Sequence, residues 1–251
     1  TFREARRAIA SHACSEFLPA ERFTGFIEPH IEQGPVLDRR REAVGVVESI
    51  VGIRQFIVDF TGEQNHAGTT PMDVRRDAFQ ALAQLAVELN ERLRPVVTPA
   101  SVWTIGRVAV HPNGPSIVPG HVTFTVQWRD GSADRLEVMD KTIRDAVAEV
   151  ADRRGVSFDL VPQLSVAPAA LDKGLVAGLQ AAAEKVVPGR WRTMPSGALH
   201  DASNVSRRLP TAMLFVPSIG GISHSFAEDT ASEHLAAGAQ VLAAAVGNLA
   251  G

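Results

Sequence analysis

Two stretches of the chain alternate between apolar and polar residues with the period of a β-strand. In the first, Phe56, Val58 and Phe60 occupy every second position. In residues 122–129, apolar side chains fill the even positions and polar side chains the odd ones, ending with Arg129. Alternation of this kind is typical of a strand with one buried face. We therefore predict two strands that turn their apolar sides toward a common core.

Two other stretches repeat apolar residues every three or four positions, which predicts amphipathic helices. They lie at residues 79–93, before a proline, and at residues 139–150, before a glycine. Further strands are expected at residues 101–110 and 156–160. The order within residues 49–166 is therefore strand, helix, strand, strand, helix, strand. Such a unit can close as a four-stranded antiparallel sheet with both helices on one face.

The segments on either side of this unit have their own helix and strand patterns. Helices are expected at residues 2–17, at 171–187 and from 231 onward, and short strands at 25–28 and 211–216. The fold class is thus α/β. We predict that an inserted α+β domain, residues 49–166, interrupts a second domain built from residues 1–48 and 167–251.

Composition limits the classes of function. With 251 residues, 45% hydrophobic and 21% charged, the chain is long enough for one large or two modest domains. A net charge of −3 gives no reason to expect nucleic acid or an anionic membrane as a partner. Cys14 is the only cysteine, which excludes an intramolecular disulfide and a multi-cysteine zinc site. A cytoplasmic location is compatible with this and is our expectation.

Four of the eight histidines lie in polar, turn-like segments that contain glycine. They are His30, His66, His200 and His224. A histidine in such a loop is available to a metal or a substrate, whereas one on an apolar stripe is usually packed. A single histidine of this kind is more often an ordinary surface or core residue than a functional one, and only the surrounding residues favour the functional interpretation.

The surrounding residues form four ordered motifs. They read HIEQGP from His30, HAGTTPM from His66, PSGALHDA around His200, and GISH ending at His224. In the residues of these motifs and in their order, the chain resembles the M20-type carbamoylases, ureidopropionases and allantoate amidohydrolases, over essentially its whole length. The resemblance implies part of a zinc-peptidase-like catalytic domain with an inserted dimerisation (lid) domain.

The resemblance implies two divalent metal ions, Zn or Mn, which activate water and polarise the bond to be cleaved. His30 and His224 would be metal ligands. His66 would reach across a homodimer as a catalytic donor to the developing oxyanion. The alternative for His66 is a turn-stabilising role, and for the other two an ordinary place in a loop.

Substrate binding is implied at a further set of positions. Arg129 matches the arginine that binds the substrate carboxylate. The planar guanidinium suits this role because it can donate two parallel hydrogen bonds to a carboxylate. A surface salt bridge with Asp130 or another neighbouring residue is the alternative. Gln33 would bond the ureido group or simply brace its loop. The remaining substrate-binding positions are Ser116, Leu199 and His200.

The chain also departs from the family pattern. No HxD segment or Glu-Glu pair precedes His30, although these would supply the bridging and catalytic carboxylates. We therefore expect a chain that begins at Thr1 to be a piece of a longer enzyme, inactive alone and without a tightly bound metal pair. Ser116, Gln127 and Leu199 replace an asparagine, an aspartate and a glycine, which leaves the substrate open.

The sequence thus predicts part of an amidohydrolase that acts on the C–N bond of N-carbamoyl or ureido amino acids. The expected partners are this small-molecule substrate and a second copy of the chain, bound through the inserted domain. One alternative is another M20 activity, aminoacylase or dipeptidase. The other is a natural truncated relative that dimerises without catalysis.

Overall fold

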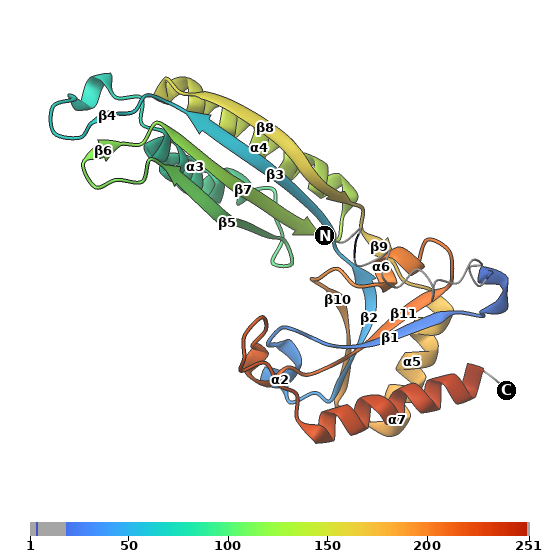
Figure 1. Cartoon of the computed structure of the whole chain (residues 1–251). Helices are drawn as coiled ribbons and strands as arrows, with labels where there is room; N and C mark the ends of the chain where they lie inside the picture. Colours follow the sequence, from blue (N-terminus) through green and yellow to red (C-terminus); the bar gives the residue numbers. More distant parts are fainter. Residues whose placement is uncertain (1–3, 5–18, 250–251) are drawn as a thin grey trace.

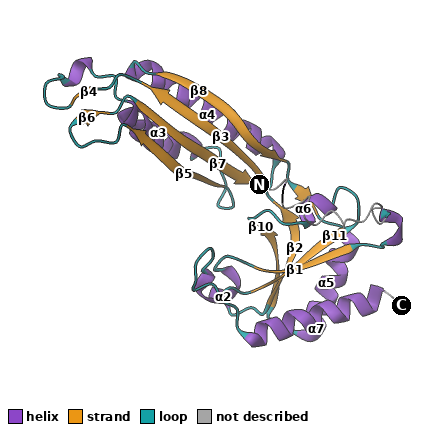
Figure 2. Cartoon of the chain, viewed as in Figure 1, coloured by secondary structure: helices purple, strands orange, loops and turns teal. Residues whose placement is uncertain are grey.

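The computed structural model describes residue 4 and residues 19–249 (Figure 1). Except for residue 4, the helix expected at residues 2–17 lies outside the described residues. The described residues form a mixed α/β fold with two larger sheets, each backed by helices (Figure 2). None of the helices in this part of the chain has both the length and the apolar character needed to cross a membrane.

The first sheet contains segments from both ends of the chain. Its strands follow the order β1 (Phe26–Ile31), β11 (Thr211–Val216), β2 (Val44–Ile50) and β10 (Trp191–Ser196), with β9 (Ala169–Ala170) also paired to β2. β1 is parallel to β11 and β10 is parallel to β2, whereas β11 and β2 are antiparallel. Helices α5 (Lys173–Val186) and α7 (Ser232–Leu249) pack against this sheet and each other. Their apolar side chains share one core with the strands.

The second sheet is formed by the middle of the chain and is antiparallel throughout. Its order is β5 (Val102–His111), β7 (His121–Asp130), β3 (Gly52–Thr61) and β8 (Ser157–Val166). Helices α3 (Ala78–Leu93) and α4 (Ala133–Arg154) pack on each other and on the sheet. Side chains at their N-caps accept backbone N–H groups, Asp77 for α3 and Ser132 for α4. Capping of this kind satisfies donors that a helix start leaves free.

The predicted alternation in β3 and β7 is confirmed. Phe56, Val58 and Phe60 are at most 2% exposed, and the even-numbered residues of β7 are equally buried. These side chains form a single core with those of both helices. Both helices therefore cover the same face of the sheet, and the odd-numbered residues of β7, among them Arg129, lie on the other face.

The chain crosses between the two sheets at two points. Val51 separates β2 from β3 on the way out, and β8 leads back into β9. Gly52 occupies the outward crossing, where a Cβ atom would lie 2.8 Å from the backbone nitrogen of Pro168. Only glycine avoids that overlap, because it has no Cβ. These crossings divide the chain into two parts. We propose that residues 1–48 with 167–251 form one domain and residues 49–166 the other.

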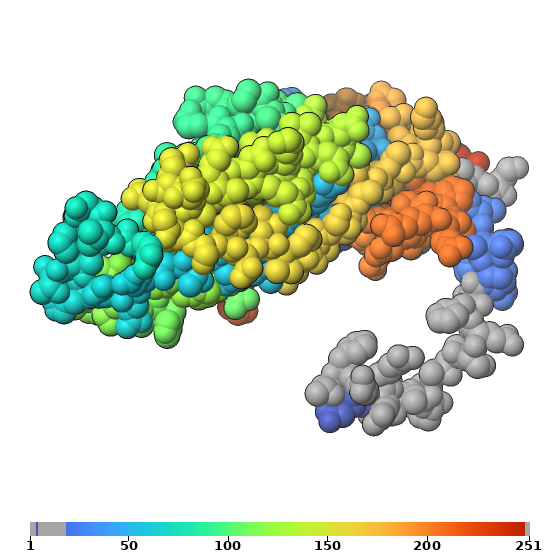
Figure 3. Space-filling model, turned by 90° about the horizontal axis from the view of Figure 1, so that it is seen from above, coloured from blue at the N-terminus to red at the C-terminus, as the bar shows by residue number. Residues whose placement is uncertain are grey.

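A short two-stranded antiparallel sheet, β4 (Asn65–His66) with β6 (Ile117–Val118), projects from the second sheet. Figure 1 shows it at the end of this sheet that is distant from β1 and β11. In the view from above, the cyan residues around β4 form one end of the molecule, well away from the orange residues around α6 (Ala202–Val205) (Figure 3). The other short helical turns are η2 (Ala20–Arg22), α2 (Val36–Arg40), η3 (Met72–Val74) and η4 (Ile219–Gly221).

Candidate metal centre

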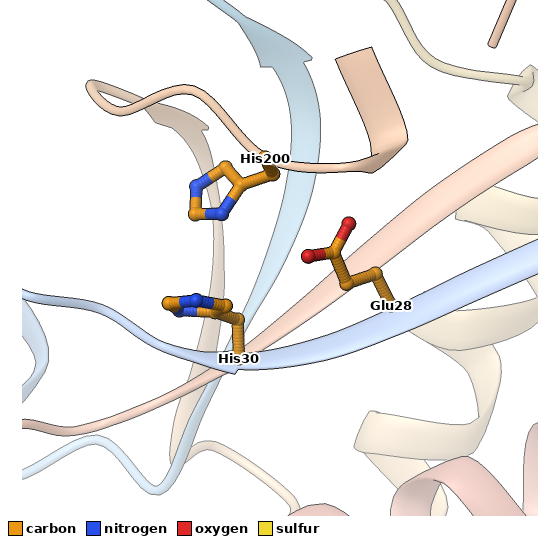
Figure 4. Close-up of side chains that lie close together, drawn as sticks. All are labelled: Glu28, His30 and His200. Atoms are coloured by element: carbon orange, nitrogen blue, oxygen red, sulfur yellow. The ribbon is translucent and has the colours of Figure 1, made fainter. Parts of the chain in front are cut away.

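Three side chains with metal-ligating atoms converge beside strand β1. Glu28 and His30 lie two residues apart on β1, so their side chains leave the same face of the strand. His200 comes from the loop after β10 (Figure 4). One ligand atom from each of the three lies within 4.8 Å of the other two, the only such group among the described residues.

Hydrogen bonds determine which nitrogen of His30 is available. Its Nδ1 lies 2.8 Å from the carbonyl oxygen of Ile31, which can only accept. Nδ1 therefore carries the proton, and Nε2 keeps its lone pair for the cluster. A ligating imidazole in a metal site commonly donates its other N–H to such a carbonyl.

Hydrogen bonds also determine which nitrogen of the His200 ring is available. Its Nε2 lies 2.7 Å from the hydroxyl oxygen of Ser196. That hydroxyl has one hydrogen, which it donates to the carbonyl of Ala198 at 3.2 Å. The bond to His200 is therefore donated by the ring, so Nδ1 is the nitrogen left with a lone pair. Figure 4 shows a ring nitrogen of His200 directed toward His30 and Glu28.

The protonation state also suits a metal ligand. Burial of His200, which is 8% exposed, and to a smaller extent the neighbouring His30 together lower its pKa to about 4. His200 is therefore neutral at physiological pH. Glu28 adds a carboxylate, one oxygen of which accepts the backbone N–H of Ala202 at 2.7 Å. Two neutral imidazoles and a carboxylate form a donor set that fits Zn²⁺ and also Mn²⁺.

A hollow of about 360 Å³ opens next to these ligands. Leu199 contributes to its wall and is 40% exposed. The hollow is lined by Glu28, His30, Leu199, His200, Asp201 and Asn204. The predicted positions Leu199 and His200 therefore do lie beside His30, and a small molecule could enter next to the cluster.

The residues after His30 are held in place by their own hydrogen bonds. Both carboxylate oxygens of Glu32 accept backbone N–H groups at the start of α2, from Val36 and Leu37, each at 2.8 Å. Gln33 adopts a positive φ of 54°, and its backbone N–H donates to the Ser218 hydroxyl. The HIEQGP motif thus folds as a strand end, a tight turn and a capped helix.

His224 is not part of the described cluster. Its own backbone N–H donates to Glu228 at 3.1 Å, and its φ is 56°. The side-chain amide of Gln33 donates to the hydroxyl of Ser223 at 3.2 Å, so the GISH loop lies against the HIEQGP turn. The predicted metal role of His224 stays a prediction.

His66 and Ser116 lie together, but away from His30. The backbone N–H of Ala67 donates to the Ser116 carbonyl at 3.0 Å, next to the paired strands β4 and β6. Nδ1 of His66 accepts the backbone N–H groups of Gly68 and Thr69. Its proton is therefore on Nε2, which leaves that nitrogen as a hydrogen-bond donor. Within one chain, the small β4–β6 sheet lies at the distant end of the second sheet and does not bring either residue to the candidate metal centre (Figure 1).

Arg129 connects the second sheet to the loop that carries His200. Its Nη1 donates to the carbonyl of Gly197 at 2.8 Å, and its Nε and Nη2 both donate to Oε1 of Gln127. The alternative pairing with Asp130 is wrong, because that carboxylate is bound to Arg135 and Ser101. Burial lowers the pKa of Arg129, and no acid in the described part of the chain pairs with it.

Two residues of this site were not predicted from the sequence. Glu28 could have been found, because a strand places residues two apart on one side and His30 was already a candidate. Ser196 is the last residue of β10, four residues before His200, and no sequence pattern indicates which hydroxyl would bond that ring.

An α/β fold with histidine and carboxylate ligands at the edge of a mixed sheet is compatible with a metal-dependent hydrolase. Residues 4–248 match the family described as Peptidase family M20/M25/M40, and the chain belongs to this family.

Individual relatives show which members of this family the chain is similar to. The chain is 38% identical over 225 residues to an allantoate amidohydrolase of Escherichia coli, covering 90% of this chain and 54% of that protein. It is 37% identical over 217 residues to an N-carbamoyl-L-amino-acid amidohydrolase of Paenarthrobacter aurescens, covering 86% and 52%. A solved amidase of the hydantoinase/carbamoylase family from Burkholderia phymatum superposes with a TM-score of 0.84 at 38% identity, covering 93% and 56%. The chain thus spans about half the length of the relatives it matches.

Proposed function

We propose that these residues are part of a metal-dependent amidohydrolase that cleaves a C–N bond of an N-carbamoyl or ureido amino acid. The observation that carries the proposal is the convergence of ligand atoms from Glu28, His30 and His200 within 4.8 Å. The names of the relatives supply the reaction class: they are amidohydrolases of allantoate and of N-carbamoyl amino acids.

Glu28, His30 and His200 would hold one Zn²⁺ or Mn²⁺ ion. His224 and further ligands from the rest of an intact enzyme would complete a pair of ions. When bound, divalent cations polarise a carbonyl and lower the pKa of a water molecule. Because the cluster has three ligand residues and no bridging carboxylate, we expect one metal equivalent and no hydrolysis by the 251 residues alone.

The substrate would lie between β1 and the loop that carries His200. Leu199 and His200 line the hollow there. Gln33, whose side-chain amide donates to Ser223, would bond the ureido group. Arg129, fixed to the carbonyl of Gly197, would provide the positive charge for the amino-acid carboxylate.

His66 and Ser116 would act on the site of a second copy. His66 presents an Nε2 donor at the distant tip of the lid, as an oxyanion donor from a partner would need. We propose that residues 49–166 form this lid and that two copies associate through it. The edge strand β5 supports the proposal, because Val102 and Val108 are exposed along it.

The metal proposal is tested by competition with a chromophoric chelator, using Zn²⁺ and Mn²⁺ separately. We expect one equivalent to bind, and Glu28→Gln, His30→Gln and His200→Gln each to weaken binding at least about tenfold. His111→Gln is the control, because His111 lies exposed on β5. Wild-type affinity in all three cluster variants would overturn the assignment.

The reaction is tested in a chimera. These residues would replace the matching half of the Escherichia coli allantoate amidohydrolase, and ammonia release from allantoate and N-carbamoyl amino acids would be measured. We expect turnover that the His30→Gln chimera lacks. A chimera that folds and binds metal but releases no ammonia from any of them would instead favour the non-catalytic dimeric relative.

A further inference from the structure

Two apolar side chains that project into solvent lie in turns at opposite places in the fold. Among residues 19–249, Phe226 and Met72 are the most exposed of the large apolar side chains, Phe226 completely and Met72 to 73%. Val74, which shares η3 with Met72, is 63% exposed. Water in contact with apolar groups costs free energy, and apolar groups that gather on a surface commonly mark a place that another molecule covers.

Phe226 lies at the apex of a hydrogen-bonded turn. The backbone N–H of Glu228 donates to the carbonyl of Ser225 at 3.0 Å, which closes a β-turn over residues 225–228. The backbone N–H of Ala227 donates to the hydroxyl of Ser225 at 3.3 Å, and Glu228 accepts the backbone N–H of His224 at 3.1 Å. The phenyl ring is therefore presented to solvent by a braced turn, two residues after His224.

This turn belongs to the rim of the candidate metal centre. The side-chain amide of Gln33 donates to the hydroxyl of Ser223, and Gln33 follows His30 by three residues. Two further apolar residues of the same loop are 44% and 41% exposed. We call the three exposed apolar residues of the loop the rim patch: Ile219, Ile222 and Phe226.

Met72 and Val74 follow the turn that orients His66, and we call them the tip patch. The hydroxyl of Thr70 donates to the carbonyl of His66 at 2.7 Å. Arg75, on the other side of η3, donates to the carbonyl of Thr70 at 3.0 Å. Hydrogen bonds on both sides of η3 therefore hold the tip patch in a defined position relative to the ring of His66.

The two patches do not meet within one chain. Figure 1 shows β4 at the far end of the second sheet, away from α2 and the start of α7, beside which the rim patch lies. In the dimer that we propose, His66 of one copy reaches the metal centre of the other. Met72 follows His66 by six residues, which span at most about 20 Å even when fully extended. The tip patch would therefore arrive at the rim of the same site.

We propose that the rim patch of one copy binds the tip patch of a second copy, with the ring of Phe226 packed against Met72 and Val74. A methionine side chain is flexible, and its sulfur makes a favourable contact with an aromatic ring. In a twofold dimer the contact forms twice, because each copy carries both patches. The inference rests on the proposed function and deepens it: an apolar contact outside the reacting atoms would hold the lid tip, and with it His66, over the candidate metal centre.

Sedimentation equilibrium of the 251-residue chain measures what the contact contributes to association. Phe226→Ser and Met72→Ser should each raise the Kd of the dimer at least about tenfold, since each removes apolar surface that only the second copy covers. In the double variant the effect should be smaller than the product of the two single effects, as expected for residues in contact. Val246→Ser is the control: Val246 is 49% exposed on α7, and its loss should change the Kd by less than about twofold.

Cross-linking tests the contact directly. In a Cys14→Ser background, protein with Met72→Cys is mixed with protein with Phe226→Cys, and a short bismaleimide joins thiols that lie close together. Each mixed dimer keeps one unaltered contact, because the other tip and rim patches are those of the wild type. We expect a cross-linked pair with one chain of each kind. A mixture with Val87→Cys in place of Met72→Cys should give much less, because Val87 is 66% exposed but lies on α3.

The outcomes separate this contact from the proposed function. A wild-type dimer whose Kd is unchanged in Phe226→Ser and Met72→Ser overturns the contact, and so does cross-linking no stronger than in the Val87→Cys mixture. A monomeric wild type overturns both the contact and the association through the lid, while chelator competition decides the metal proposal separately. Coupled effects on the Kd and selective cross-linking in a protein that binds no metal would keep the contact and remove the proposed function.

Discussion

The hydroxyl oxygen of Ser196 accepts a hydrogen bond from Nε2 of His200 over 2.7 Å, with both side chains buried. This bond gives His200 the tautomer whose Nδ1 lone pair faces Glu28 and His30. A serine outside the cluster thus orients one of its three ligands for binding a cation. The relationship makes Ser196 a residue that supports a ligand without being one.

Replacing Ser196 by alanine should therefore weaken metal binding while the ligands remain. The ring of His200 would lose its fixed tautomer and leave a buried N–H without an acceptor. We expect Ser196→Ala to reduce Zn²⁺ affinity about 10- to 100-fold in chelator competition. Ser206→Ala is the control, since that hydroxyl bonds the carbonyl of Ser203. An unchanged affinity in Ser196→Ala would contradict the tautomer argument.

Stability of the metal-free protein should fall on acidification because of His200. Burial lowers its pKa to about 4 from 6.5, so the unfolded chain takes up a proton first as the pH falls. The stabilising contribution is complete above 6.5 and is lost as the pH falls through 4. A shift of this size corresponds to at most about 3 kcal/mol.

Urea denaturation in the presence of EDTA measures this effect. The free energy of unfolding should decrease between about pH 7 and pH 4.5 in the wild type, and less steeply in His200→Gln. His111→Gln provides the control, because that histidine is exposed. Identical slopes in wild type and His200→Gln would show that the ring is not held neutral by burial.

Periodicity predicted the second sheet well because its strands have one buried and one open face. Phe56, Phe60 and Trp128 stand at alternate positions and are buried, as the pattern required. Strand β2 carries no such signal: Val44, Val46 and Val47 are buried with Gly45 between them. A strand that is covered on both faces has a short continuous run of apolar residues. Periodicity alone cannot distinguish such a run from other buried segments.

The candidate metal centre was predictable only in part, for a related reason. The motif around His30 and the strand alternation could together indicate Glu28. The approach of His200 depends on the parallel pairing of β10 with β2 and of β11 with β1, between segments far apart in sequence. Pairing at such distances is set by the assembled core, and local residue patterns do not encode it.

Two glycine-to-alanine substitutions should have opposite effects on stability. Gly221 has a φ of 70°, and a Cβ there would lie 2.6 Å from the nitrogen of Pro35. Gly221→Ala should therefore destabilise the protein by about 1–3 kcal/mol and loosen the GISH loop from the HIEQGP turn. The midpoint of urea denaturation measures the change.

Gly178 is the matched control for this substitution. It lies within helix α5, and nothing stands within 4 Å of a Cβ built there. Gly178→Ala should stabilise the protein by up to about 1 kcal/mol, because alanine loses less backbone entropy in a helix. A destabilised Gly178→Ala or a neutral Gly221→Ala would refute the corresponding packing argument.

The tautomer of His66 should depend on an arginine that does not touch it. Arg75 donates to the carbonyls of Thr70 and Ala67 at 3.0 Å and 2.5 Å, and so holds the turn whose N–H groups bond Nδ1 of His66. Long-range ¹H–¹⁵N NMR above about pH 8 should find the proton on Nε2.

Arg75→Ala should release the turn and produce a mixture of the two tautomers of His66, because the backbone donors no longer converge on Nδ1. Arg76→Ala removes the same charge one residue later, but Arg76 pairs with Glu63 at the surface and should leave the tautomer unchanged. A single Nε2–H tautomer in both variants would mean that the HAGTTPM turn keeps its shape without Arg75. The oxyanion donor proposed for the lid would then depend on the backbone of the turn alone.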